Sequence, residues 1–236
     1  MPAFVQKALG GDNAGTLVSS FSATASGGFT ANNAIVGAMT WYGSTTTQAN
    51  ISAISDGTKS YNVAASTVDY LKNSDNVDVL TFLLTGITPG ATTITVTFAS
   101  QGIYCRLAFH EISGAGFVDV HGINTQSGAG SAVGPNITTN YNGEYVYLAT
   151  VDTVQSTTFG NNSTGFTIEN LAGSSDNVAM ADEYQILTSA GLLSGGGFTS
   201  TQTPSDFISA ILAISAPRFI IPQIAAFGPE TISILA

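Results

Sequence analysis

The alternation of apolar and polar residues is clearest between residues 91 and 122. Over residues 94–98 the apolar side chains face one way and the threonines face the other, as in a half-buried strand. Residues 103–112 alternate in the same way, with Cys105 on the more apolar face. Because residues 100–102 between them contain a glycine and resemble a short turn, the pattern predicts an antiparallel hairpin at the centre of the fold.

Similar strand patterns recur along most of the chain, separated by turn residues. The sequences Asp56-Gly57 and Asn142-Gly143 predict hairpin turns, and residues 79–84 are apolar throughout, which predicts a strand covered on both faces. Residues 152–164 are polar and predict a loop, and no helix longer than one turn is predicted. The further predicted strands are 4–6, 17–25, 34–42, 51–55, 60–63, 117–123, 137–139, 144–151, 166–169, 178–187 and 207–214. The sequence therefore predicts an all-β protein, an antiparallel jelly-roll β-sandwich over residues 1–215.

Residues 216–236 form a different kind of segment, which is strongly apolar and rich in proline. Pro217, Pro222 and Pro229 are too closely spaced for a long regular strand or helix, so the sequence predicts an extended C-terminal arm. Burying one large apolar side chain is worth about 1.5–3 kcal/mol, so the arm should be covered. Two interpretations of what covers the arm stay open. It is either an edge segment folded back on its own sandwich or an arm docked on a neighbouring subunit. The predicted subunit-contact residues are Phe219, Ile220, Ile221, Ile224, Phe227, Ile232 and Leu235.

Charge is scarce in this chain. Only 8% of its residues are charged, and five Lys and Arg stand against fifteen Asp and Glu. Such a composition fits either a surface buried against other subunits or an extracellular β-protein with a Ser, Thr and Asn surface. The basic residues are scattered, so we expect neither nucleic acid nor an anionic membrane as a partner. The N-terminus shows no secretory signal pattern and no stretch is long enough to span a membrane, which favours a virion protein assembled in the host cytoplasm and exposed to the exterior.

Residues with catalytic or metal-binding chemistry are few. Cys105 is the only cysteine and lies on an apolar strand face, where a small hydrophobic role is expected instead of a catalytic thiolate. The only cluster of metal-ligand types is His110, Glu111, Asp119 and His121. Its spacing matches no metal motif, so a hydrogen-bonded structural role is expected beside the metal alternative.

Enzymatic activity is not predicted. Glutamates at strand ends, such as Glu111, Glu144 and Glu183, keep a glycosidase as an alternative, but they form no tight motif on one strand. The sequence contains neither a G-x-S-x-G elbow nor a Walker loop. We therefore predict no catalytic residue, no cofactor and no metal.

A glycan-binding surface is the alternative to assembly. Trp41, Tyr42, Tyr61 and Tyr70 lie near predicted turns, where aromatic rings can stack on sugar faces. The competing interpretation places Trp41 in the core, since large aromatic side chains dominate cores.

The order of these segments also resembles a known kind of module. Residues 4–214, and above all ISDGTKSY, TITVTF and RLAFHEISG with the following Asp119, are similar to jelly-roll modules of bacterial surface and phage structural proteins. The resemblance implies a lectin-like sandwich and carries no catalytic residues, and the segment from Ala216 onward departs from it.

We expect a non-enzymatic structural protein of a phage virion, as a head decoration or a tail- or fibre-type subunit. Its partners would be itself, in a homo-oligomer such as a trimer, and other virion proteins. The alternative is a carbohydrate-binding module on a bacterial or viral surface, with cell-surface glycans as ligands.

Overall fold

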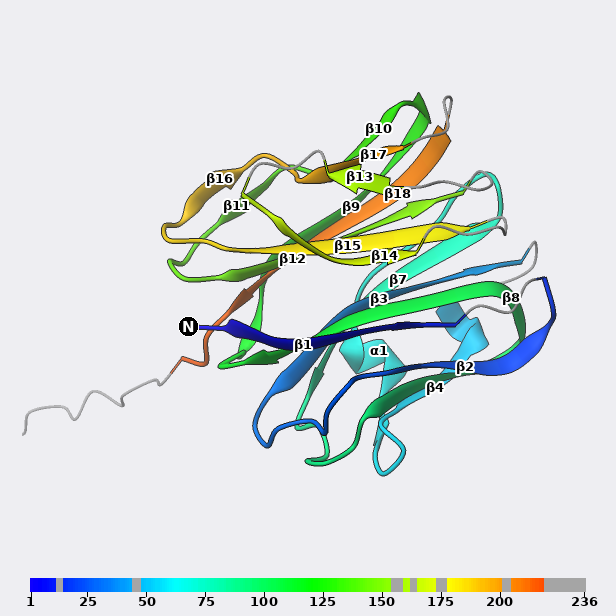
Figure 1. Cartoon of the computed structure of the whole chain (residues 1–236), viewed down its shortest axis with the longest axis horizontal. Coiled ribbons are helices and arrows are strands. Elements are labelled where there is room, and N and C mark those ends of the chain that lie inside the picture. Colours follow the sequence, from blue (N-terminus) through cyan, green and yellow to red (C-terminus); the bar gives the residue numbers. More distant parts are fainter. Residues whose placement is uncertain are drawn as a thin grey trace, which may run out of the picture.

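The computed structural model consists of antiparallel strands with very little helix, which confirms the predicted all-β class (Figure 1). The helical segments among its described residues are the single turn α1 (Val63–Ser66) and the 3-10 turn η1 (Gln48–Asn50). The structure describes residues 1–11, 15–43, 48–153, 159–161, 165–172, 178–200 and 205–218.

The first sheet is eight-stranded and is organised around the long strand β8. Its order is β5-β4-β8-β3-β7-β6, and β1 and β2 also pair with β8. The first half of β8 pairs with β2 and β4, and the second half pairs with β1 and β3. The sheet therefore curls around β8 into a half-barrel. Its strands are β1 (Ala3–Gly10), β2 (Val18–Thr24), β3 (Ala34–Tyr42), β4 (Ile51–Ser55), β5 (Ser60–Tyr61), β6 (Thr67–Lys72), β7 (Val77–Thr85) and β8 (Thr93–Ser113).

The second sheet is five-stranded, with the order β14-β15-β12-β18-β9. Its strands are β9 (Phe117–Ala129), β12 (Tyr145–Asp152), β14 (Thr167–Ala172), β15 (Ala179–Ile186) and β18 (Ser205–Ser215). Two small sheets, β10-β17-β13 and β11-β16, supply residues to the core on its outer face. Their strands are β10 (Ser131–Val133), β11 (Ile137–Thr139), β13 (Phe159–Asn161), β16 (Gly191–Leu193) and β17 (Gly197–Ser200).

The central strands of both large sheets are apolar on both faces, so each of them is covered twice. In β3, Ile35 and Met39 face the core inside the half-barrel, whereas Val36 faces the second sheet. In β12, Tyr147 faces the first sheet and Leu148 faces the small outer sheets. The molecule is thus a stack of layers in which the central strands are buried throughout. The same arrangement confirms the prediction that residues 79–84 lie between two layers.

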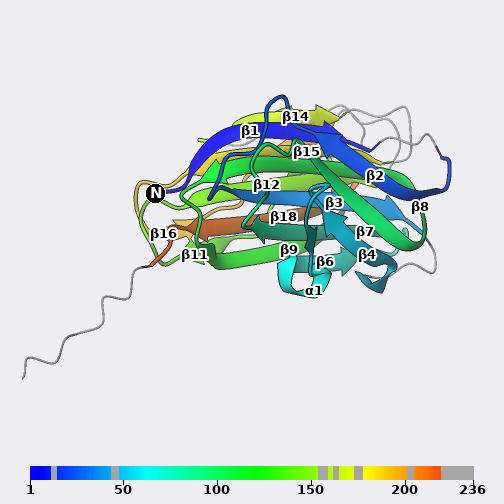
Figure 2. The same cartoon turned by 90° about the horizontal axis from the view of Figure 1, so that it is seen from below.

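A polar side-chain contact joins the two large sheets at each of their paired edges. Figure 2 shows β1 beside β14 at one edge and β6 beside β9 at the other. At the first edge, Lys7 Nζ forms an ion pair with Glu169 Oε2 at 3.1 Å. At the second edge, His121 Nδ1 lies 2.9 Å from Asp69 Oδ1. Partly exposed contacts of this kind contribute little free energy.

The predicted hairpin of residues 94–98 and 103–112 is wrong, because both segments belong to the single strand β8. The neighbours on each side of β8 change near Gly102, where the ladder with β2 skips from Gly102 to Thr97. Tyr104 has a positive φ of 53°, and a Cβ on Gly102 would lie 2.5 Å from the ring of Phe98. The glycine therefore bends the strand between two parts of the half-barrel and does not reverse it.

The other turn predictions have mixed outcomes. Asp56-Gly57 does join a hairpin, since β4 and β5 pair directly. The strands on either side of Asn142-Gly143 form as predicted, but the hairpin is wrong: β11 pairs with β16, and β12 pairs with β15 and β18. The predicted loop 152–164 contains the short strand β13. The antiparallel β-sandwich is confirmed, whereas the jelly-roll connectivity and the boundary at residue 215 stay predictions.

Gly37 provides a test of the layered packing. A Cβ at this position of β3 would lie 2.6 Å from both the Ala108 carbonyl oxygen and the Phe82 ring. Gly37→Ala should therefore lower the free energy of unfolding by about 1–3 kcal/mol through overpacking. Gly27→Ala is the matched control, because its nearest neighbour is an ordinary contact at 3.5 Å. Chemical denaturation of both variants checks the expectation, and equal stabilities would contradict it.

Candidate functional site

The described chain ends at one end of the stack, where Arg218 is anchored on aromatic side chains. The Arg218 guanidinium lies 3.9 Å from the centre of the Tyr141 ring and 5.4 Å from that of Phe117. Such contacts between a cation and an aromatic face are attractive. The predicted subunit-contact residues lie outside the described residues. They are Phe219, Ile220, Ile221, Ile224, Phe227, Ile232 and Leu235.

An apolar hollow of about 440 Å³ lies directly beside this point. It is lined by Met1, Asn142, Gly143, Ile186, Leu187, Thr188 and Ala216. A hydrogen bond connects the turn before β16 to a lining residue of the hollow, since Ala190 N donates to Asn142 Oδ1 at 2.7 Å. We call the hollow together with Leu192 of β16 the exit end.

The exit end also carries exposed apolar side chains. Met1 and Leu192 are the most exposed large apolar residues that the structure describes, at 75% and 73%. Figure 1 shows the N-terminus, β11, β16 and the end of β18 together at this end of the molecule. Exposed apolar side chains gathered beside an apolar hollow are typical of an interaction site.

The four aromatic residues predicted to stack on glycans do not form a platform. Trp41 has no exposed area and packs against the partly buried Tyr70 and against Phe98, with ring centres 6.2 and 6.0 Å apart. Tyr61 is 8% exposed and donates its hydroxyl hydrogen to Asp56 Oδ2. Only Tyr42 of the four is exposed, at 37%. The structure thus corrects the expectation for Trp41 and Tyr61, whose rings are enclosed by the core of the half-barrel.

The predicted cluster of metal-ligand residue types is spread over separate places. His110 is buried between the large sheets, His121 contacts Asp69 across the sheet edge, and Asp119 accepts hydrogen bonds from Asn140. Glu111 accepts hydrogen bonds from Thr30 N and Asn33 Nδ2. No group of three or more ligand residues that could hold a metal occurs among the residues the structure describes.

His110 instead belongs to a buried polar network between the two large sheets. Its Nδ1 lies 2.7 Å from the Tyr145 hydroxyl, and its Nε2 lies 3.2 Å from Asp182 Oδ1. The Tyr147 hydroxyl donates to the other oxygen of Asp182 at 3.1 Å. Burial, followed by the charge of Asp182, raises the pKa of Tyr147 well above its ordinary value. The phenol therefore stays a hydrogen-bond donor, and the network holds the sheets in register.

Sequence reasoning missed this network because its members lie on different strands. Asp182 and Tyr147 are on β15 and β12, far along the chain from His110. The available signal was an aspartate within a largely apolar strand pattern, since a buried carboxylate requires partners.

Glu144, directly before β12, is an unusual carboxyl group close to the hollow. It has no exposed area, and neither of its carboxyl oxygens has a hydrogen-bond partner among the described residues. Burial, together with the neighbouring Asp119 carboxylate, raises the pKa of Glu144 to about 7. Asp119 is held in place by the backbone N–H of Asn140 at 2.8 Å. Glu144 therefore keeps its proton to a higher pH than an exposed glutamate does.

The thiol of Cys105 and the basic side chains serve the fold. Burial raises the pKa of Cys105 to about 12, so the thiol is protonated at neutral pH. Lys59 Nζ donates to Gly86 O at 2.9 Å, Lys72 Nζ lies 3.9 Å from Asp78 Oδ2, and Arg106 Nη1 donates to Gly11 O at 3.0 Å. Together with Lys7 and Arg218, every basic side chain has a partner within the fold.

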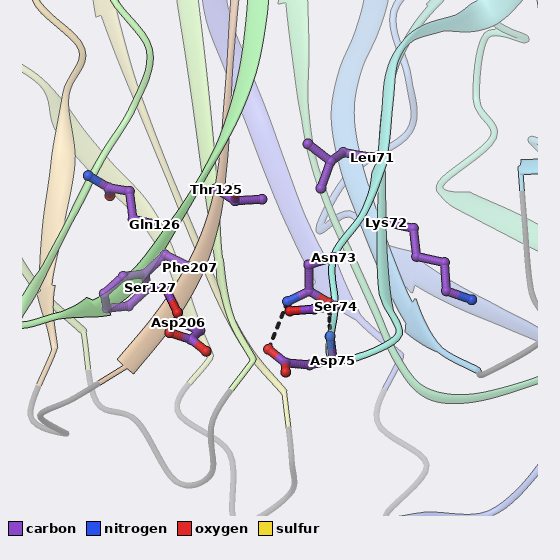
Figure 3. Close-up of a pocket in the computed structure, with 10 residues that line it drawn as sticks. All are labelled: Leu71, Lys72, Asn73, Ser74, Asp75, Thr125, Gln126, Ser127, Asp206 and Phe207. Carbon is purple, nitrogen blue, oxygen red and sulfur yellow. Dashed lines mark hydrogen bonds between the residues drawn. The ribbon is translucent and has the colours of Figure 1, made fainter.

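A polar groove of about 320 Å³ opens between the large sheets, beyond the contact of His121 with Asp69. Figure 3 shows Asp75, on the turn between β6 and β7, and Asp206, at the start of β18, on opposite sides of it. Asp206 Oδ1 accepts a hydrogen bond from Gly128 N at 2.8 Å, and Asp75 Oδ2 accepts one from Asn73 Nδ2 at 3.0 Å. The groove is lined by Leu71, Lys72, Asn73, Ser74, Asp75, Thr125, Gln126, Ser127, Asp206 and Phe207.

Comparison with known proteins gives no match: no family model, no curated protein sequence and no solved structure matches this chain. Within the part of the chain that the structure describes, none of the helices has the length and apolar character needed to cross a membrane.

The Glu144 carboxyl predicts a specific pH dependence of stability. Since its pKa rises from 4.5 to about 7 on folding, its contribution to stability is complete below pH 4.5 and is lost as the pH rises through about 7. Glu144→Gln should remove this loss, so its stability relative to the wild type should increase across that window. Urea denaturation at pH 4.5, 6 and 8 measures the difference. A difference between Glu144→Gln and the wild type that stays constant over these three pH values would contradict the assignment.

Proposed function

We propose that this protein is a non-enzymatic structural subunit of a phage virion, either a head decoration or a tail- or fibre-type protein. It assembles with copies of itself, as in a trimer, and with other virion proteins, on a particle built in the host cytoplasm and exposed to the exterior. The observation that carries the proposal is the exit end, where an apolar hollow and two exposed apolar side chains adjoin the start of a strongly apolar C-terminal sequence.

The distribution of charge supports an assembling subunit over a catalyst or a nucleic-acid binder. The five basic side chains have partners within the fold, and only 8% of all residues are charged. His110 is enclosed between the sheets and makes a structural network with Asp182 and Tyr145. A surface of neutral polar residues with one apolar end suits packing against neighbours.

Stability of the sandwich supports the same role. The central strands β3 and β12 are buried along nearly their whole length, and the described residues form three packed hydrophobic clusters. A rigid module with a separate contact segment is a suitable component of a particle. The phage assignment itself comes from the resemblance of residues 4–214 to phage structural modules.

Removing residues 219–236 tests the proposal. The truncated chain keeps Ala216 and the Arg218 contact, so it should fold with unchanged circular dichroism and lose assembly, because the apolar contact segment is absent. Light scattering of the full-length and truncated proteins gives their masses, and mass spectrometry of purified virions tests the location. A full-length protein that is monomeric, together with a truncated chain that unfolds, would show that the segment belongs to the core of the monomer.

A carbohydrate-binding module is the second candidate, and the polar groove between the sheets is the observation that favours it. Paired carboxylates and amides such as Asp75, Asp206 and Asn73 resemble the hydrogen-bonding groups that hold sugar hydroxyls. This groove replaces the aromatic platform that was expected from the sequence, since Trp41 and Tyr61 are buried.

A glycan array separates this candidate from the assembly role. Binding that disappears in Asp206→Ala and persists in Tyr42→Ala would place the glycan in the groove. The expected loss is about tenfold or more in affinity, because the buried hydrogen bonds to the sugar lose their partner. An array without signal for the full-length wild-type protein would reject the glycan-binding candidate and leave the assembly proposal untouched.

A further inference from the structure

We infer that the hollow at the exit end is the acceptor site for the C-terminal segment, residues 219–236, of a second copy of this chain. The inference rests on the proposed function, because it names the surface through which the subunits would assemble. It also assigns a partner of defined chemistry, namely an extended apolar segment.

The chemistry of the hollow limits what can occupy it. None of the side chains that line it is charged, and Met1, Ile186, Leu187 and Ala216 give it an apolar wall; Met1 also carries the α-ammonium group of the N-terminus. A cationic partner would lose hydration there without gaining an opposite charge, whereas an apolar side chain gains by leaving water. Residues 219–236 supply a strongly apolar segment within the same chain.

The position and length of the segment favour a neighbouring copy. The described chain ends at Arg218, two residues after Ala216, which itself lines the hollow. The 18 residues that follow reach about 60 Å when extended, far more than the hollow beside them requires. Pro217 and Pro222 fix their own backbone φ and favour an extended residue before each, which opposes an immediate reversal into the adjoining hollow.

The anchoring of Arg218 adds a second constraint. Its guanidinium lies over Tyr141 and Phe117, so the chain leaves the sandwich from a fixed point. An arm that leaves from a fixed point and is spaced by prolines loses less conformational entropy when it is ordered on a neighbour. If each copy both gives an arm and accepts one, the contact forms a symmetric oligomer when the rotation between copies closes and an open filament when it does not.

Disulfide trapping between full-length chains tests the inference. Thr188 is exposed on the rim of the hollow, and the natural thiol of Cys105 is buried, so a cysteine placed at Thr188 reacts selectively. Thr188→Cys protein with one tag is mixed with Phe227→Cys or Ile224→Cys protein carrying another tag. The expected main product of mild oxidation is a disulfide between the two differently tagged chains. Ser20→Cys, on an exposed position of β2, is the control and should give no such product.

The remaining outcomes overturn the inference in distinguishable ways. A double variant, Thr188→Cys with Phe227→Cys, that closes only within one chain would show that each arm fills its own hollow. An oligomer that forms without any cross-link to Thr188→Cys would place the contact elsewhere and leave the proposed assembly intact. A full-length wild-type protein that stays monomeric would overturn both the acceptor site and the assembly.

A charge introduced at the hollow gives an independent measurement in the full-length chain. Ala216→Lys should weaken self-association by about tenfold or more, because the ammonium group loses hydration in a site whose lining offers no carboxylate. Ser20→Lys adds the same charge on an exposed position of β2 and should leave association unchanged. Equal association of the two variants, with circular dichroism unchanged, would contradict the inference.

Discussion

The structure depends on one constraint: the central strands β3 and β12 are apolar on both faces, so neither strand can border water on either side. Each of these strands has to be covered twice, and the chain meets this requirement by stacking layers. The half-barrel closes over one face of β3, the two large sheets cover each other, and the small outer sheets cover the far face of β12. The long strand β8 makes the first closure possible because it bends at Gly102 and serves both parts of the half-barrel.

Polar groups inside this stack lie close to one another. His110, Asp182, Tyr145 and Tyr147 form a connected network between the sheets. Glu144 lies outside this network, and its pKa is raised because it is buried beside another carboxylate. The scarce cations serve the fold, as Lys7 does at one sheet edge and Arg218 does at the end of the described chain. Little positive charge is left over for recognition, which is consistent with assembly through apolar contacts.

Much of the secondary structure could be predicted from local patterns, whereas the pairing of strands could not. Residues 34–42 were predicted as a strand with the bounds that β3 has, and the alternation of β8 correctly separated Cys105 and Leu107 from Ala108. The hairpin within β8 failed because a short Ser-Gln-Gly segment permits either a reversal or a bend, and distant strands decide between them. The candidate site was harder still. Burial of Trp41 and the partners of His110 follow from contacts between strands far apart in the sequence, which carry no local signal.

Assembly through the exit end is the central claim, and hydrogen exchange of the intact protein tests it most directly. Amide exchange is measured by mass spectrometry at concentrations above and below the point of association. The account predicts added protection in peptides that cover residues 186–193 and 139–143, with no change around the groove formed by Asn73, Asp75 and Asp206. Protection confined to the groove, or identical exchange at both concentrations, would contradict it.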